Sequence, residues 1–383
     1  MTDEIRSEVD LDEMPDEEEE HLYYATPGQL MWWQFRKHKA ALIAITVLGL
    51  MYFLAFFADL FVPYAIMDRF GGYDNSPPTK IHFRDEEGVW QGPFVYKLKR
   101  TVDPETIAVV FVEDTSEMYP IRFFMERDAR KILGIIPIKW RLYGTEGGED
   151  APPVFLFGAD KLGRDLFSRT LYGSLISLLI GFGGVILTFT FGISLGGLAG
   201  YVGGTTDEVI MRIVDFMVAI PKIPLWMGLA AAVPRDWPVI RTYFAITLIL
   251  SVVSWGGLAR AVRGKLLSLR EEDYIMAAQV YNAPVLRLIG RYMLPNFMSY
   301  LLVNITLSIP WSILGETSLS FLGLGIQPPA VSWGTLLKDA QKLTVVAQRP
   351  WQLIPGAFVV TAVLMFNFIG DGLRDAADPY SKL

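Results

Sequence analysis

The sequence predicts an all-α polytopic membrane protein with six transmembrane helices and a small β-rich extracytoplasmic insertion between the first and second helices. Three observations predict this fold class. Hydrophobic residues make up 52% of the chain. Several apolar runs reach the roughly 20 residues that a helix needs to cross a hydrocarbon core of about 30 Å. After the first run, a segment of roughly 95 residues contains short β-rich stretches separated by Gly and Pro.

The first apolar run fixes the expected orientation. It is preceded by basic residues at 36–39 and by an aromatic group, Trp32, Trp33 and Phe35, that is typical of a membrane interface. Positive charge on this flank places the amino terminus in the cytoplasm. Six crossings then place both termini there, together with the cationic residues at 260–270. The predicted spans are residues 40–62, 171–200, 208–233, 242–262, 297–316 and 354–370.

The spans divide the chain into four regions. Residues 1–39 form an acidic cytoplasmic tail with a basic flank, and the block at 3–20 is typical of a disordered, solvated segment. Residues 40–62 form the first span, and 63–157 form the insertion. A core of five spans is expected at 158–383.

The insertion has two interpretations. Its β-rich runs at 106–112, 119–125 and 135–142 favour a small β-rich domain. An ordered loop packed over the spans is the alternative. Neither a pair of carboxylates nor a histidine cluster in this region indicates chemistry.

Composition excludes several kinds of site. The chain has no cysteine, so a disulfide scaffold, a thiolate metal site and a cysteine nucleophile are all ruled out. Its three histidines are too scattered to share a helical face. No GxxxxGK[ST] phosphate loop occurs, so the chain cannot by itself hold the phosphates of ATP as P-loop ATPases do. Glycine-rich stretches at 181–184 and 192–204 lie in or beside an apolar run and predict close helix packing. We expect a non-catalytic subunit without a metal or cofactor of its own.

The most informative stretch is a polar, cationic segment at 264–296 between two apolar runs. A helix from about Glu271 would place Tyr274, Ala277, Ala278 and Tyr281 on one face, at i, i+3, i+4 and i+7. Small side chains on this face would let the helix enter a cleft in a partner. The alternative is an amphipathic helix lying on the inner leaflet.

The end of this predicted helix is marked by two residues. Asn282 tolerates the left-handed conformation that ends helices, and Pro284 cannot continue one. A second short helix is expected at 286–293. The Leu294-Pro295 pair is expected to stop it before the next span.

The segment at 264–296 resembles the coupling segment of ABC-transporter permeases, whose pattern is Glu-Ala-Ala, three residues, Gly, and then Ile-any-Leu-Pro. We therefore call it the coupling segment. The matching positions here are 276–278, Asn282 and 292–295, with Met276, Asn282 and Tyr292 replacing the usual Glu, Gly and Ile. In that family the helix inserts into a groove on the ATPase. The residues that the resemblance assigns to this contact are Tyr274, Ile275, Met276, Ala277, Ala278, Tyr281, Asn282, Leu286 and Pro295.

Three further segments, at 157–169, 316–329 and 367–379, resemble the dipeptide, oligopeptide and nickel subfamily of these permeases. Six spans with an insertion after the first resemble its C-type subunit. The resemblance implies an importer in a bacterial or archaeal cell (inner) membrane that works by alternating access. Its partners would be a B-type permease, two ABC ATPases that bind ATP and Mg, and an extracytoplasmic solute-binding protein, with membrane lipid around it and no nucleic acid.

The substrate class implied by the resemblance is short peptides. Oligosaccharides, opines and nickel chelates are alternatives for the same importer type. A secondary transporter is a more distant alternative, and would require inverted repeats and paired intramembrane ionisable residues. A membrane-anchored receptor would need one span rather than six.

Four charged residues are candidates for the pathway or its outer mouth: Asp160, Arg164, Asp165 and Glu316. The first three precede the second span, and the spacing of Asp165 from Arg169 permits an ion pair. Structural bracing at the interface is the alternative to substrate contact. Glu316, with the Gly-Pro-rich stretch after it, is expected either to line the outer mouth or to cap a re-entrant segment.

The third predicted span contains two polar features. Arg212 and Asp215 lie at i, i+3 and are expected to pair with each other, because an isolated intramembrane charge is costly. Pro221 and Pro224 are expected to loosen the hydrogen bonding of this span, which would help the helix to bend.

Overall fold

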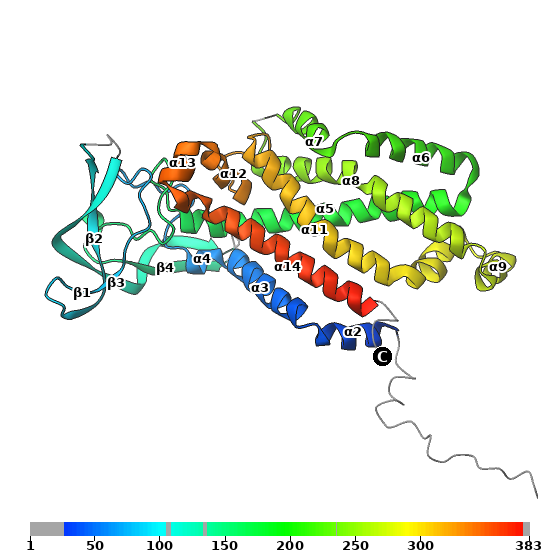
Figure 1. The fold of residues 1–383 in the computed structure, drawn as a ribbon, viewed down its shortest axis with the longest axis horizontal. Helices are drawn as coiled ribbons and strands as arrows, with labels where there is room; N and C mark the ends of the chain where they lie inside the picture. Colours follow the sequence, from blue (N-terminus) through cyan, green and yellow to red (C-terminus); the bar gives the residue numbers. More distant parts are fainter. Residues whose placement is uncertain (1–26, 105–108, 133–135, 235, 378–383) are drawn as a thin grey trace, which may run out of the picture.

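A computed structural model describes residues 27–104, 109–132, 136–234 and 236–377. The acidic block at 3–20 therefore lies outside the described residues. Figure 1 shows an elongated helical bundle with a β-sheet at one end and a short helix, α9, at the other. We refer to these as the sheet end and the α9 end.

The helices fall into spans and connecting pieces. Those of the bundle are α3 (Lys39–Phe56), α5 (Leu166–Val202), α6 (Gly204–Ala219), α7 (Lys222–Ala231), α8 (Val239–Leu269), α11 (Met298–Phe321) and α14 (Ile354–Ala377). The shorter ones are α2 (Pro27–Lys37), α4 (Ala58–Phe61), α9 (Asp273–Val280), α10 (Val285–Arg287), α12 (Trp333–Leu337) and α13 (Leu343–Gln348). Short 3₁₀ turns at Gly148–Asp150, Lys338–Gln341 and Pro350–Leu353 connect some of these elements.

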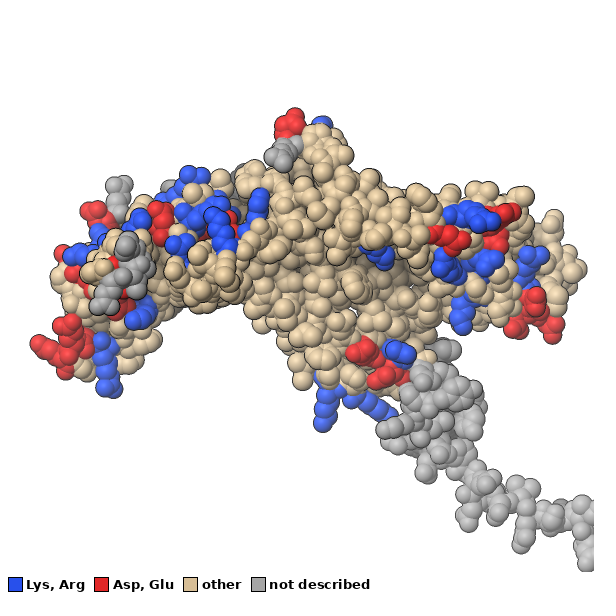
Figure 2. Space-filling model, turned by 45° about the horizontal axis from the view of Figure 1, so that its top comes forward, with Lys and Arg blue, Asp and Glu red and all other residues tan. Residues whose placement is uncertain are grey.

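The predicted membrane-spanning fold class is confirmed. Within the described residues, five helices are long and apolar enough to cross a membrane, and α6 with α7 makes a sixth if the pair is one span. Charged side chains on the face shown in Figure 2 gather mostly toward the two ends, and the middle is largely uncharged. A belt of this kind suits contact with lipid.

Helix α5 is the central helix of the bundle and packs along α8 and α11. Its glycine-rich face allows this contact: a Cβ at Gly196 would lie 2.4 Å from the carbonyl oxygen of Ala259, and one at Gly200 would lie 2.8 Å from that of Arg263. Real Cβ atoms do not approach so closely, so only glycine fits at this crossing. The predicted role of the glycine stretches in helix packing is confirmed.

The third predicted span, residues 208–233, is broken in the structure. Helix α6 ends at Ala219, α7 begins at Lys222, and the two are bent by 92°. Pro221 is the N-cap of α7 and Pro224 lies in its first turn. Because proline lacks the N–H that a continuous helix would need here, the predicted loosening amounts to a complete break.

The insertion contains a four-stranded antiparallel sheet in the order β1-β2-β3-β4. The strands are β1 (His82–Arg84), β2 (Trp90–Val102), β3 (Val109–Ile132) and β4 (Ile136–Thr145). The β-rich prediction is confirmed, but the described part of the run expected at 106–112, residues 109–112, shares one long strand with the run expected at 119–125. Turn residues between the runs suggested a break, whereas cross-strand pairing such as Val95 with Tyr119 keeps the chain extended.

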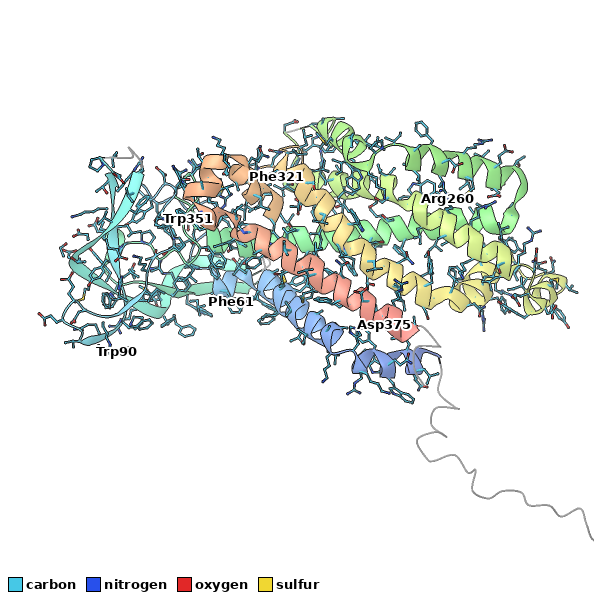
Figure 3. The ribbon with its side chains drawn as sticks, viewed as in Figure 1. Phe61, Trp90, Arg260, Phe321, Trp351 and Asp375 are labelled. Atoms are coloured by element: carbon cyan, nitrogen blue, oxygen red, sulfur yellow. The ribbon has the colours of Figure 1, made fainter. Side chains whose placement is uncertain are left out.

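The sheet covers a small core of its own. Val95, Ile121, Tyr143 and Val154 are buried together. At the far end of the sheet, the exposed Trp90 stacks on Phe83 (Figure 3). The sheet is thus a small layer attached beyond the end of the bundle where α4 lies.

Helix α2 packs against the end of α14, and this contact changes one prediction. Trp32 and Trp33 are exposed, as an interfacial aromatic group should be, but Phe35 is buried against Ala41 and Ala376. His38 caps α3 by accepting a hydrogen bond from the Ala41 N–H at 3.1 Å. The sequence could not distinguish these aromatic residues because their partners belong to the other end of the chain.

Candidate functional site

The coupling segment lies at the α9 end, where it joins α8 to α11 (Figure 1). Ile275 fixes α9 to the bundle: its side chain is completely buried in the cluster that contains Leu266, Ile289 and Met293. Asn296 donates a hydrogen bond from Nδ2 to the Tyr274 hydroxyl at 2.7 Å. Ile275 is therefore an anchor within this chain, although the sequence places it among the residues that contact a partner.

The opposite side of the segment is an exposed apolar surface. Tyr281 is 87% exposed and Leu286 is 83% exposed, and Met276 and Ala277 are exposed between them and Tyr274. Val280 is 85% exposed as well. Soluble surfaces seldom carry apolar groups clustered in this way without a binding role.

Val280 was missed by the sequence analysis. The signal was its position four residues after Met276, which places the two side chains on the same helical stripe. We call the exposed set Tyr274, Met276, Ala277, Val280, Tyr281 and Leu286 the α9 surface.

The turn after α9 has the predicted conformation. Asn282 adopts a left-handed backbone with φ of 54°. Its N–H donates to the Gln279 carbonyl at 2.8 Å, and the Ala283 N–H donates to the Ala278 carbonyl at 3.2 Å. Asparagine thus ends the helix where the related pattern has glycine.

The second arm differs from the prediction. A regular helix at 286–293 with a stop at Leu294-Pro295 was expected, but α10 continues through a π-helical stretch (Leu288–Met293) and a 3₁₀ turn (Leu294–Phe297) into α11. Pro295 cannot donate a backbone hydrogen bond, and changes in helical pitch accommodate it without ending the helical path. Coupling segment and span are therefore mechanically continuous.

Ion pairs connect α6 to α8 near this end. Arg263 pairs with Asp207, and Arg260 pairs with Asp215 at 2.6 Å. Figure 3 shows the position of Arg260 on α8, below α6. The predicted pairing of Arg212 with Asp215 is wrong, because Arg212 instead lies 3.9 Å from Glu208. Local spacing cannot reveal a partner that comes from another helix.

At the sheet end, Asp160 forms the centre of a buried charged cluster. Its carboxylate pairs with Arg164 at 2.7 Å and also with Arg169, and all three side chains are less than a tenth exposed. The predicted pairing of Asp165 with Arg169 is therefore wrong. The turn that ends at Arg164 brings Asp160 back over the start of α5, and this geometry is not visible in helical spacing.

Asp165 is the N-cap of α5. It accepts hydrogen bonds from the Ser168 N–H at 2.8 Å and from the Ser168 hydroxyl at 2.5 Å. Burial nevertheless raises the pKa of Asp165 to about 6, because the hydrogen bonds from Ser168 only partly offset the loss of water. Its other oxygen, Oδ1, is buried without a hydrogen-bond partner among the described residues. The hydrogen bonds from Ser168 indicate that Asp165 stabilises the start of α5.

Glu316 is completely buried within α11 and does not face an open mouth in this structure. Its carboxylate accepts hydrogen bonds from Ser320 at 2.7 Å and from Ser177 at 3.3 Å. The Ser177 hydroxyl also accepts from the Trp333 N–H at 3.1 Å. Glu316 therefore connects α5 to the start of α12, which matches the alternative in which it caps a re-entrant segment.

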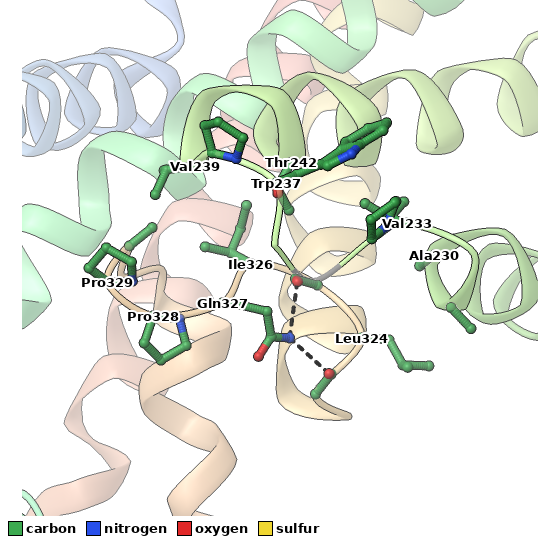
Figure 4. Close-up of a pocket in the computed structure, with 16 residues that line it drawn as sticks. Ala230, Val233, Trp237, Val239, Thr242, Leu324, Ile326, Gln327, Pro328 and Pro329 are labelled. Atoms are coloured by element: carbon green, nitrogen blue, oxygen red, sulfur yellow. Dashed lines mark hydrogen bonds between the residues drawn. The ribbon is translucent and has the colours of Figure 1, made fainter.

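The Gly-Pro-rich stretch after Glu316 lines a cavity of about 260 Å³ toward the sheet end of the bundle (Figure 4). The facing wall is the turn between α7 and α8, with Trp237 and Thr242. Gln327 fixes the loop by donating to the carbonyls of Gly323 and Gly325 at 2.9 and 3.2 Å.

None of these sites has the donors of a metal centre. Within the described part of the chain, no three His, Cys, Asp or Glu side chains are grouped so that they could hold a metal ion. What the geometry offers is a helical frame with an exposed apolar surface at the α9 end.

Comparison with known proteins agrees with this architecture. The sequence-family model described as a binding-protein-dependent transport system inner membrane component matches residues 192–382. The model of the N-terminal TM domain of oligopeptide transport permease C matches residues 26–78. Neither model covers residues 79–191, where the sheet lies.

Individual relatives cover between about three fifths and four fifths of this chain. The dipeptide transport system permease protein DppC of Haemophilus influenzae is 35% identical over 306 residues, which cover 79% of this chain and 99% of the relative. The oligopeptide transport system permease protein OppC of Bacillus subtilis is 39% identical over 233 residues, covering 60% of this chain and 74% of the relative. A solved structure of the inward-facing MetNI methionine ABC transporter covers 55% of this chain and 97% of its own, at 16% identity and a TM-score of 0.45.

The chain therefore belongs to the family of binding-protein-dependent transport system inner membrane components, which are permease subunits of ABC importers. Within that family it is a C-type subunit of the group that includes the oligopeptide and dipeptide permeases. The resemblance predicted from the coupling segment and the three further segments is confirmed.

Proposed function

We propose that this chain is the C-type membrane subunit of an ATP-driven, binding-protein-dependent importer of short peptides. It contributes half of a pathway that alternates between inward and outward access, while separate subunits bind and hydrolyse ATP with Mg. The names of two relatives, one oligopeptide permease OppC and one dipeptide permease DppC, support short peptides as the substrate class. The partners that this function requires are a B-type permease, two ABC ATPases and a solute-binding protein.

The observation that carries the proposal is the α9 surface. It is apolar, exposed and rigidly connected through Ile275 to the helices of the bundle. Ile275 of α9 packs against Ile289 and Met293, which lie on the unbroken helical path from α10 into α11. A push on α9 would therefore be passed to α11. Alternating access requires this kind of connection between an ATPase and the spans.

The proposal also assigns the sides of the membrane. The α9 end faces the cytoplasm and the ATPases, and the sheet end faces the extracytoplasmic solute-binding protein. Both termini then lie in the cytoplasm, in agreement with the basic flank at residues 36–39. The buried cluster around Asp160 braces the extracytoplasmic end, and the cavity in Figure 4 forms part of the outer mouth.

The test changes the α9 surface without touching the core. Ala277→Glu places a bulky charge on the exposed surface, and Ala277→Ser keeps a small uncharged side chain at the same position. We expect Ala277→Glu to leave membrane insertion intact while ATP hydrolysis no longer drives uptake, and Ala277→Ser to retain uptake. Unchanged uptake by the Ala277→Glu protein would contradict the docking role.

A further inference from the structure

The break between α6 and α7 opens onto a second cavity, of about 540 Å³. It lies at mid-depth in the bundle, because Gly184, at the midpoint of the 37-residue α5, forms part of its wall. Leu250 and Ser254 of α8 and the middle turns of α11 complete it. This cavity is separate from the outer cavity of Figure 4, and the coupling role of α9 does not account for it.

The lining of this cavity is mainly apolar but includes several polar side chains. Five hydroxyl side chains border it: Thr188, Ser254, Ser308, Ser312 and Ser318. Lys222, the first residue of α7, is the one ionisable side chain among the described residues of the lining.

Lys222 is exposed on the surface of this chain and lies at the break between α6 and α7. Among the described residues, its ammonium group has neither an ion-pair nor a hydrogen-bond partner. A lysine at the centre of a membrane span costs roughly 3 kcal/mol even on the lower experimental scales, and such residues mark the routes of ions and substrates. The cavity is therefore bordered by an exposed positive charge that is free to pair with an anionic group.

Other hydrogen-bond donors line the same cavity. Helix α7 begins with no side-chain cap, so the backbone N–H groups of Lys222 and Ile223 have no intrahelical acceptor. The positive end of the helix dipole reinforces the charge of Lys222.

We propose that this cavity binds a carboxylate group of the transported molecule, with Lys222 as its counter-ion and the start of α7 as its hydrogen-bond donor. The proposal rests on the proposed function, in which the chain lines a substrate pathway. A short peptide carries such a carboxylate at its carboxyl terminus. Ser254, Ser308 and Ser312 already donate to backbone carbonyls, so their hydroxyl oxygens then accept hydrogen bonds from the peptide without selecting its side chains.

The cysteine-free sequence provides a direct test. In the complex purified through this chain, Ser312→Cys introduces a single thiol into the wall of the cavity, and the rate of its reaction with a maleimide reports occupancy. Trialanine and its C-terminal amide are the two probes. We expect trialanine to slow the labelling at concentrations at least tenfold lower than the amide requires.

Variants of Lys222 separate the charge from a general loss of structure. In the Ser312→Cys background, Lys222→Met should abolish the difference between the two probes, and Lys222→Arg should keep it. Lys80→Met, which removes an exposed lysine of the insertion, should change nothing. Assembly of each variant is checked by size-exclusion chromatography.

Equal protection by both probes, protection that survives in the Lys222→Met protein, or no protection by either probe would overturn the carboxylate site. Failure of the proposed function is a different observation, namely that the wild-type complex in liposomes takes up no peptide when ATP is supplied. The two failures are therefore distinguishable.

Discussion

Replacement of Ile275 with alanine should release α9 from the bundle. Helix α9 has eight residues, and isolated helices shorter than about 12 residues are marginal in water, so its order depends on tertiary contacts. Ile275 is its one completely buried side chain among the described residues, and it reaches the main hydrophobic cluster. Truncation of a buried isoleucine to alanine typically costs about 2–5 kcal/mol.

This loss of local stability can be measured as a faster rate of amide hydrogen exchange in α9. A loss of about 2 kcal/mol, at the lower end of that range, increases the open population of α9 roughly 30-fold. Hydrogen–deuterium exchange with mass spectrometry on the purified protein in nanodiscs measures this directly for peptides that cover residues 271–284. We expect the increase to be confined to this segment, because the spans keep their own packing.

Val280→Ala is the matched control on the same helix. Val280 is 85% exposed, so its truncation should change the local stability by less than about 0.5 kcal/mol. Similar exchange in the Ile275→Ala protein and in wild type would show that Ile275 does not anchor α9. Comparable acceleration in the Val280→Ala protein would contradict the distinction between anchor and surface.

Three further predictions concern the bundle and the sheet end. Gly196→Val should lower the thermal midpoint in detergent by an amount corresponding to about 1–3 kcal/mol, because a Cβ would lie 2.4 Å from a carbonyl oxygen of α8; an unchanged midpoint would refute the close packing. Asp160→Ala should cost about 3–5 kcal/mol by leaving two buried guanidinium groups unpaired, whereas Lys161→Ala, which breaks an exposed pair of 2.7 Å, should cost less than about 1 kcal/mol; equal melting of the two variants would contradict the structure. The raised pKa of Asp165 means that the folded state favours the protonated carboxyl group, so the stabilisation from this group is fully present below about pH 4 and is lost as the pH rises to about 6. The thermal midpoint of wild type relative to that of Asp165→Asn should therefore fall between these pH values, by at most the equivalent of about 3 kcal/mol, and stay constant above them. A difference that does not change with pH would contradict the burial of this group.

The sequence predicted features that depend on local chemistry. Apolar runs located the spans because a helix must bury or shield every backbone group in lipid. The left-handed turn at Asn282 followed from the tolerance of asparagine for that conformation, and the break before Lys222 followed in part from the two nearby prolines. The ABC-permease relationship followed from the coupling segment and three further motifs.

Features that depend on distant partners could not be predicted. Arg169 and Asp215 have suitable partners nearby in sequence but pair with Asp160 and Arg260 instead. Ile275 and Met276 are neighbours in an apolar pattern, yet only the packing of α8 and α11 decides that the first is buried and the second exposed. In both cases, tertiary geometry overrides what spacing permits.

The cavity beside Lys222 is also a product of tertiary structure. The sequence shows a lysine between two prolines in a predicted span, which by itself indicates a bend. The hydroxyl groups that share the cavity come from α5, α8 and α11, so their convergence on Lys222 appears only in the folded chain.

The most direct test of the central claim is to purify the complex through a tag on this chain under mild conditions, and to identify by mass spectrometry the co-purifying subunits and any ligand on the solute-binding protein. The account predicts a second permease, ABC ATPase subunits and bound short peptides. Saccharides, opines or nickel chelates in place of peptides would contradict the proposed substrate, and a chain that purifies without any ATPase would contradict the role of the α9 surface.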